Sequence, residues 1–343
     1  MNNLILDGVL LAILSGAMNG SFTLPMRFLG QWEWENVWSL FIVVACLLMP
    51  TVIVSMTAPG SWAILAHAPT AAVWIAVLTG FAWGFGAVLF GQSVSAIGIS
   101  LANTLVLAIS SALGSLLPIL LLRPESLFRP AGKNILGSIT VELAGIGLCG
   151  WAGRQREREA GTGSERGDMV GRARPVRVAI LMALGSGVLS AVFNIGFSLA
   201  HPIADYGRAA GLSPFASANI IWLIMLSSGA VANLGFCAYL FRRNNSFQKF
   251  FQPGRIRLFG LSATMALLWG GSIFVYGASV PRLGPLGASI GWPLSLAVGL
   301  LLANAIGLAL GEWRGVSPRA RAWMYAGIFV LVVAVILLSR VNS

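Results

Sequence analysis

The stretch SGAMNGSFTLP, residues 15–25, sets one carboxamide, Asn19, among small and apolar residues, and its pattern returns later in the chain. The second copy is SAVFNIGFSLAHP, residues 190–202, which contains Asn194. Five positions match at a constant separation of 175 residues: Ser15 with Ser190, Asn19 with Asn194, Phe22 with Phe197, Thr23 with Ser198 and Leu24 with Leu199. The recurrence indicates that the chain is built from two related halves.

A second stretch also occurs in two similar copies, one in each half of the chain, and it follows the first stretch in both halves. We call each such pair of matched stretches an echo. WGFGAVLFGQSVSAIG, residues 83–98, aligns without gaps to WGGSIFVYGASVPRLG, residues 269–284. The two copies share a tryptophan, three glycines, a serine and a valine, and Phe90 faces Tyr276. Two echoes in the same order are hard to attribute to chance, which strengthens the prediction of an internal repeat.

The composition indicates a membrane protein. The 343 residues are 57% hydrophobic and 10% charged, whereas a soluble domain carries about 25% charged residues. So few charges cannot cover a water-facing surface, and we expect a polytopic, all-α membrane protein. The net charge of +11 comes from residues between the apolar segments, which points to membrane orientation and not to nucleic-acid binding.

Ten segments are long and apolar enough to cross a bilayer as helices, for which about 17–25 residues suffice. They are 4–24, 36–57, 72–94, 100–122, 134–151, 176–200, 215–241, 256–280, 286–311 and 320–339. The first has no basic region before it and no Ala-x-Ala site after it, so we interpret it as a retained helix and not a signal peptide.

The basic residues predict the orientation of these spans. Of the 22 lysines and arginines, sixteen lie between spans on one side of the membrane and six on the other. The richer side is expected in the cytoplasm, which leaves both termini outside, in the periplasm of a bacterium.

The polar stretch 153–175 divides the chain into residues 1–152 and 176–343, each with five spans. It is rich in glycine and mixed in charge, so we interpret it as a solvated cytoplasmic linker, with a regulatory loop as the alternative. Because five is odd, the second half enters from the opposite side and forms an inverted repeat. That architecture is typical of secondary transporters, in which the two halves rock around a site near the midplane.

The paired asparagines fit this arrangement. Each is expected about 8 Å from the midplane, on opposite sides of it. Two polar stripes share helix faces at i, i+4 spacing: Ser15, Asn19 and Thr23, and Ser190, Asn194 and Ser198. They either form hydrogen bonds between helices, worth about 0.6 kcal/mol each, or line a substrate cavity.

Several stretches resemble the L-rhamnose–proton symporter family of the drug/metabolite transporter superfamily, over nearly the whole chain. The resemblance is clearest in LPMRFLGQWEWENVWS (24–39), GFAWGFGAVLFG (80–91), AHPIADYGRAAGLSP (200–214) and NLGFC (233–237). It implies ten spans, external termini, five-plus-five repeats, and uptake of L-rhamnose with a proton across the bacterial inner membrane. The chain departs from the family pattern in its small residues within spans 3, 4, 8 and 9, and in His201, where a lysine is expected before Pro202.

A neutral sugar needs amides and hydroxyls for its polar groups and an aromatic face for its C–H side. The candidate substrate residues are Asn19, Asn194, Trp83, Trp269, Tyr276, Gln92, Asn103 and Asn219. The two tryptophans have plain packing as an equal alternative. Asn233 and Asn304 are interpreted as helix-to-helix hydrogen-bonding residues.

Proton coupling needs an ionisable group that changes protonation during transport. Glu142, in SITVELAGIGLC, is the one acidic residue deep in a span, and such residues mark pathways. It shares a helix face with Ser138 and Cys149 and is the first candidate, against the alternative of a structural, protonated glutamate at the bundle edge. His201 is the second, because histidine titrates near neutral pH.

The sequence has no phosphate-binding glycine loop, no metal-ligand cluster and no nucleophile elbow. We therefore expect neither an enzyme nor an ATP-driven pump, and no cofactor or metal, with the proton as coupling ion. The expected partners are the sugar, the proton and the lipid bilayer, while the oligomeric state stays open. The alternatives are an exporter or exchanger of another small metabolite, and a membrane sensor or assembly subunit without transport.

Overall fold

The computed structural model describes residues 3–29, 32–160 and 175–341, apart from the side chains of Arg27, Ser95 and Ala96. Every regular element in these ranges is helical. The long helices are α1 (Asn3–Ser21), the continuous run of α2 (Trp34–Ile42), η2 (Val43–Leu48) and α3 (Met49–Thr57), α5 (Thr70–Ile97), α6 (Ile99–Leu122), α7 (Pro130–Glu159), α8 (Val176–Leu199), α10 (Pro214–Asn244), α11 (Arg255–Ser279), α12 (Gly287–Ala309) and α13 (Pro318–Ser339).

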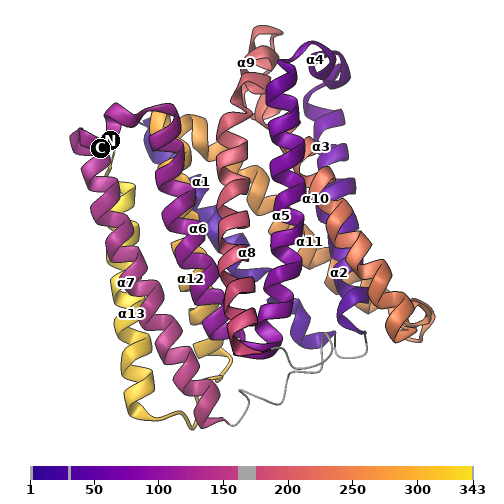
Figure 1. Cartoon of the computed structure of the whole chain (residues 1–343), viewed down its shortest axis with the longest axis vertical. Helices are drawn as coiled ribbons and strands as arrows, with labels where there is room; N and C mark the ends of the chain where they lie inside the picture. The colour runs from indigo at the N-terminus through magenta and orange to yellow at the C-terminus, as the bar shows by residue number, and fades with distance from the viewer. Residues whose placement is uncertain (1–2, 30–31, 161–174, 342–343) are drawn as a thin grey trace.

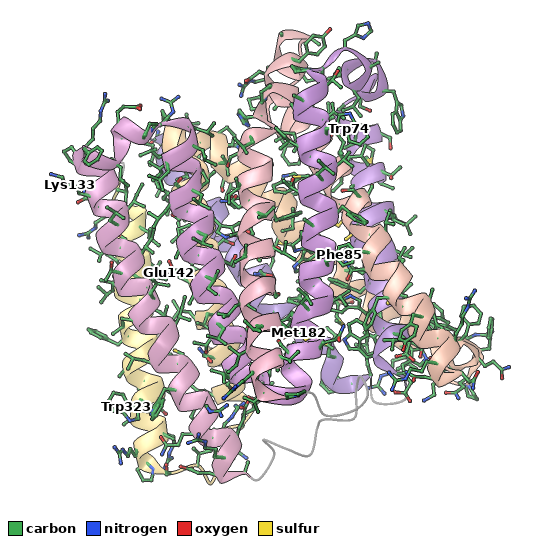
Figure 2. The ribbon with its side chains drawn as sticks, in the orientation of Figure 1. Trp74, Phe85, Lys133, Glu142, Met182 and Trp323 are labelled. Carbon is green, nitrogen blue, oxygen red and sulfur yellow. The ribbon has the colours of Figure 1, made fainter. Side chains whose placement is uncertain are left out.

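Each predicted span corresponds to one of these helices or runs. Nine segments of the described ranges are long and apolar enough to cross a membrane, and one of them, Arg255–Ala309, contains both α11 and α12. The protein is thus a multi-pass membrane protein. Its outer surface is apolar, as lipid requires: on α5, Trp74 and Phe85 are 59% and 49% exposed (Figure 2).

Two glycines matched by the second echo break the chain at equivalent places. Gly98 has φ +82° and separates α5 from α6, while Gly284 has φ +78° and lies in η6 (Val280–Leu286), between α11 and α12. This left-handed region is open to glycine and costly for residues with a Cβ. Both copies of the second echo thus end at a glycine that separates two long helices.

The helix ends define two ends of the bundle. The terminal end is where α1 begins and α13 ends, and the linker end is the opposite one, where α7 ends and α8 begins (Figure 1). Two short helices, α4 (Ser61–His67) and α9 (His201–Ala209), lie at the terminal end. The predicted linker 153–175 begins inside α7, which runs to Glu159, and its residues 161–174 lie outside the described residues.

The helices of the two halves interleave. α1 packs on α11 and α12, whereas α8 packs on α5 and α6, and α7 packs on α13 at one edge of the molecule (Figure 1). Glycine permits the closest of these approaches: a Cβ on Gly20 of α1 would lie 2.3 Å from the carbonyl oxygen of Gly299 on α12. Small residues at helix interfaces are the usual way in which membrane helices come into contact.

Candidate functional site

A cavity of about 340 Å³ opens in the half of the bundle nearer the linker end. Its walls come from the end of α1, the first turns of α6, the last turns of α7 and α12, and the start of α13. We call it the linker-end cavity. Its volume lies in the range of small-molecule sites, about 300–1,000 Å³.

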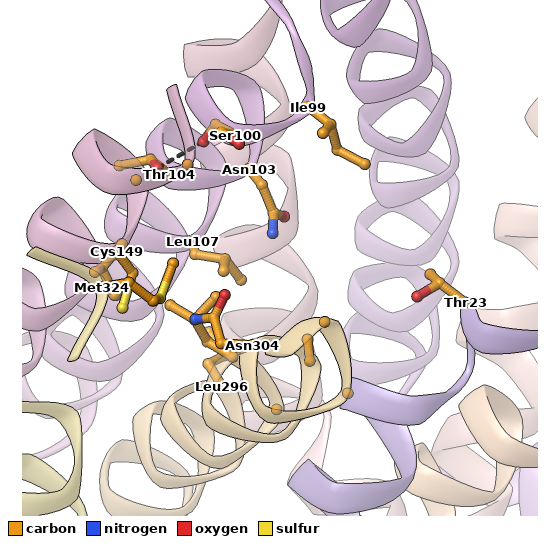
Figure 3. A pocket seen from close by; sticks show the side chains of 18 of the residues that line it. Thr23, Ile99, Ser100, Asn103, Thr104, Leu107, Cys149, Leu296, Asn304 and Met324 are labelled. Atoms are coloured by element: carbon orange, nitrogen blue, oxygen red, sulfur yellow. Dashed lines mark hydrogen bonds between the residues drawn. The ribbon is translucent and has the colours of Figure 1, made fainter. Parts of the chain in front are cut away.

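Three asparagines line this cavity: Asn19, Asn103 and Asn304. In Figure 3 the side chains of Asn103 and Asn304 point toward the same space, with Thr23 on its far side. Asn19 forms no hydrogen bond with another described residue, and the buried Nδ2 of Asn304 has no partner there either. These amides are therefore available to a ligand with hydroxyl groups.

The helix-bonding interpretation holds for one of its two asparagines. Asn233 accepts a hydrogen bond from Trp38 Nε1 at 2.9 Å and donates to the carbonyls of Gly84 and Gly229. Asn304 instead faces the cavity, so the sequence reasoning missed it as a candidate. Asn304 lies one turn after Leu300 on α12, and Leu300 also lines the cavity. This spacing could indicate a cavity residue only after the other residues of the wall were known.

Two charged residues, Arg156 and Glu312, form part of the wall of the linker-end cavity. Arg156 of α7 forms an ion pair with Glu312 at 2.5 Å, and its guanidinium lies 5.2 Å from the ring centre of Trp313. Glu157, the next residue on α7, accepts hydrogen bonds from the backbone N–H and hydroxyl of Ser100 at the start of α6. These contacts connect the end of α7 to α6 and to the turn between α12 and α13.

A second cavity, of about 430 Å³, lies toward the other end of the molecule, and we call it the terminal-end cavity. It is lined by the ends of α6 and α8, by η6 and by the start of α12. The coupling candidate His201 lies in its wall, beside Phe197 and Ser198. The matched positions Phe22 and Thr23 line the linker-end cavity.

Asn194 lies one turn before Ser198, a residue in the wall of the terminal-end cavity. It is fully buried, and its Nδ2 donates to Gly114 O at 2.8 Å and to Ala288 O at 3.3 Å. Its Oδ1 accepts a hydrogen bond from the Tyr276 hydroxyl. One amide thus joins α8 to α6, α11 and α12, so Asn194 and Tyr276 are bound to protein, whereas Asn19 faces open space.

This difference predicts unequal effects on stability. Asn194→Ala should lower the free energy of unfolding by about 1–3 kcal/mol, because it leaves buried partners unsatisfied. The matched control Asn19→Ala should change it little, since no hydrogen bond of its amide to the protein is lost. Thermal unfolding in detergent compares the two variants, and equal losses would contradict the assignment.

The tryptophans of the second echo stack on each other. The rings of Trp83 and Trp269 are 5.2 Å apart and nearly parallel, at 12°. They line neither of the two cavities. A chain of ring contacts extends from them in both directions, to Phe22 in one cavity wall and Phe197 in the other; its members are Phe22, Phe41, Trp269, Trp83, Phe193, Trp222 and Phe197.

The remaining substrate candidates lie elsewhere. Gln92 is half-buried near the end of α5, outside both cavity walls. Asn219 is fully buried on α10, one turn before Trp222, and neither polar atom of its amide has a hydrogen-bond partner among the described residues. A buried amide without protein partners calls for water or a ligand.

Glu142 is fully buried on α7 and accepts a hydrogen bond at 2.8 Å from the Ser111 hydroxyl of α6. Its other carboxyl oxygen, Oε1, has no partner in the described part of the chain. Ile146, one turn further along α7, lines the linker-end cavity. Glu142 therefore lies about one helical turn beyond the inner wall of that cavity.

No group of three or more potential metal ligands occurs among the residues described.

A family model and individual relatives match this chain over nearly its whole length. The family model for the L-rhamnose-proton symport protein (RhaT) matches residues 1–341. The chain is 26% identical over 341 residues to the L-rhamnose-proton symporters of Citrobacter koseri and Salmonella paratyphi B, with 97% of each chain covered.

These relatives are named as symporters, so the protein is a transporter and not an enzyme. The resemblance drawn from the quoted stretches is confirmed at the level of the family. The chain belongs to the L-rhamnose-proton symport protein family.

Proposed function

We propose that the protein takes up L-rhamnose, or a related deoxy sugar, together with a proton. Membership of the family and the names of its relatives support this substrate and this coupling ion. The observation that carries the proposal is a pair of cavities, one toward each end of the bundle, with matched residues of the repeat in their walls.

The two halves form an inverted repeat in this proposal. Matched serines make equivalent contacts: Ser15 of α1 lies 2.9 Å from Ser295 of α12, and Ser190 of α8 lies 3.0 Å from Ser110 of α6. Asn194 bonds to Gly114 one turn beyond Ser110, and Asn19 lies beside Gly299 one turn beyond Ser295. Such pairs are expected where α1–α12 and α8–α6 are copies of one unit.

Alternating access then consists of an exchange of roles between the two asparagines. Asn194 holds the inner side of the terminal-end cavity closed through three helices, while Asn19 stands free in the linker-end cavity. In the opposite state Asn19 bonds to the Gly299 carbonyl and Asn194 is released. Rocking of inverted halves produces such an exchange without any new fold.

The sugar binds first to the asparagines that the protein leaves unbonded. Asn19, Asn103 and Asn304 offer donors and acceptors from three sides of the linker-end cavity. The aromatic chain between the two cavities supplies flat apolar faces for the C–H side of the ring. Asn219 contributes a further amide beside this chain, deeper in the bundle.

The membrane setting follows from the basic residues. The linker end carries the arginines of α7 and of the start of α13, so we place it in the cytoplasm and both termini in the periplasm. The membrane is the bacterial inner membrane. The linker-end cavity therefore opens toward the cytoplasm and the terminal-end cavity toward the periplasm.

Sugar-induced proton movement tests the substrate and the coupling together. Protein reconstituted into liposomes with an external pH electrode should produce alkalinisation when L-rhamnose is added, and the signal should disappear with a protonophore. If neither L-rhamnose nor other deoxy sugars move protons or label, the substrate is wrong.

The second candidate is an exporter or exchanger of another small metabolite. It is favoured by the Arg156–Glu312 pair in the cavity wall, because a neutral sugar needs no charged partner. A panel of competitors separates the two candidates: neutral deoxy sugars should inhibit uptake under the first, and charged or zwitterionic metabolites under the second.

A further inference from the structure

A third cavity, of about 240 Å³, lies on the outer surface at the linker end, where α7 meets α13. Its lining consists of Trp151, Arg154, Gln155, Arg158 and Arg319. We call it the arginine pocket. The first four residues share one face of α7 at spacings of three and four, so the helix itself gathers them.

The carboxylates near this pocket are engaged elsewhere. Glu157 accepts from Ser100, and Glu159 accepts from the Ser317 backbone N–H at 2.8 Å and hydroxyl at 2.6 Å. Within the described ranges, neither Arg158 nor Arg319 has a salt bridge. Glu159 also accepts a hydrogen bond from the pocket residue Gln155 at 3.2 Å. Three guanidinium groups therefore meet in one pocket, and among the described residues neither nearby carboxylate forms a salt bridge with them.

The surroundings of the pocket are those of a lipid surface. α7 and α13 form one edge of the bundle (Figure 1), and Trp151 is 60% exposed there. On α13, Trp323 (Figure 2) is 37% exposed and Phe329 is 69% exposed. Tryptophan is enriched at the level of the headgroups, and the apolar surface beyond it faces acyl chains.

We propose that the arginine pocket binds the phosphodiester headgroup of an anionic phospholipid. Basic pockets between membrane helices suit such headgroups, and guanidinium groups bind phosphate oxygens in a bidentate manner. Trp151 lies about one turn before Arg154 on α7, and Arg158 lies one turn after Arg154. A lipid with its phosphate among the arginines therefore extends its acyl chains along α7 and α13. A bound lipid here braces the end of α7, whose Arg156 and Gly153 line the linker-end cavity.

Native mass spectrometry of the full chain in an uncharged detergent tests this proposal. Phosphatidylglycerol titrated into the protein should form one tightly held adduct, and phosphatidylcholine should not. The variant R158Q/R319Q should bind phosphatidylglycerol about thirtyfold more weakly, since each basic residue near a membrane surface contributes about a fivefold factor. R158K/R319K, which keeps both charges but not the bidentate geometry, should bind more tightly than R158Q/R319Q and more weakly than the wild type.

The matched control is R129Q/K133Q, which removes two charges from the opposite end of the same helix (Figure 2) and should leave the adduct unchanged. Equal binding of the two lipids would overturn the proposal, as would a wild-type titration from R158Q/R319Q. Displacement of the lipid by inorganic phosphate at the same concentration would also overturn it, because the pocket would then be a site for free anions.

Discussion

Replacement of Glu142 by glutamine should abolish concentrative uptake of the sugar. If one proton enters with each neutral sugar, a membrane potential of about 100 mV supplies about 2.3 kcal/mol, enough for roughly fiftyfold accumulation. Glutamine keeps the size and the hydrogen bond from Ser111 but cannot exchange a proton. The steady-state ratio in E142Q proteoliposomes should therefore fall to about onefold.

The position of Glu142 gives this prediction its physical basis. One of its oxygens accepts a hydrogen bond from Ser111 and the other has no partner among the described residues, so a proton can be gained or lost there without rearrangement of a network. An uncompensated carboxylate in the middle of a membrane protein is costly, which marks such groups as functional. Exchange of internal for external sugar, which needs no net proton movement, should persist in E142Q.

Two further measurements distinguish a coupling role of Glu142 from a structural role. Ser111→Ala removes the donor but not the carboxyl group, so it should keep coupling and change its pH dependence. Accumulation by E142Q at the wild-type level would assign Glu142 a structural role. Loss of exchange together with a fall in the thermal midpoint would do the same.

Replacement of Asn304 by leucine should weaken sugar binding about tenfold to a hundredfold. Leucine branches at Cγ as asparagine does but removes both the donor and the acceptor, and a hydrogen-bonding group left without its partner costs about 1–3 kcal/mol. Asn19→Leu on the facing wall should have an effect of similar size. Because neither amide bonds to another described residue, the thermal midpoint without sugar should stay near that of the wild type.

Isothermal titration with L-rhamnose measures the sugar affinity of the Asn304 variant, and thermal unfolding measures its midpoint without sugar. Asn134→Leu is the matched control, since Asn134 is exposed on α7 outside both cavities. Wild-type affinity in both N304L and N19L would show that the linker-end cavity is not where the sugar binds.

The spans could be predicted from the sequence because hydropathy and length set them directly. The predicted segment 256–280 became α11, Arg255–Ser279, and 100–122 became α6, Ile99–Leu122. The end of α7 could not be predicted, because residues 154–159 are polar and read as linker. They are helical because Arg156, Glu157 and Glu159 each bond to a neighbouring helix or loop.

The candidate site could be predicted only in part. Asn19 and Asn194 occur in the same motif, yet one lines a cavity and the other is fully bonded. The difference comes from the neighbours Gly114, Ala288 and Tyr276, which bond to Asn194 alone, so the motif itself does not contain it. The second echo matches Trp83 with Trp269, but only the packing shows that they stack on each other.

The central claim is that the two cavities open in turn. The most direct test places a cysteine at either of two matched wall positions, Thr23 or Ser198, in a background without the native cysteines. With sugar and a proton gradient, the rate of labelling by a hydrophilic maleimide should rise at one position and fall at the other. Rates that change in the same direction, or do not change at all, would contradict alternating access in this protein.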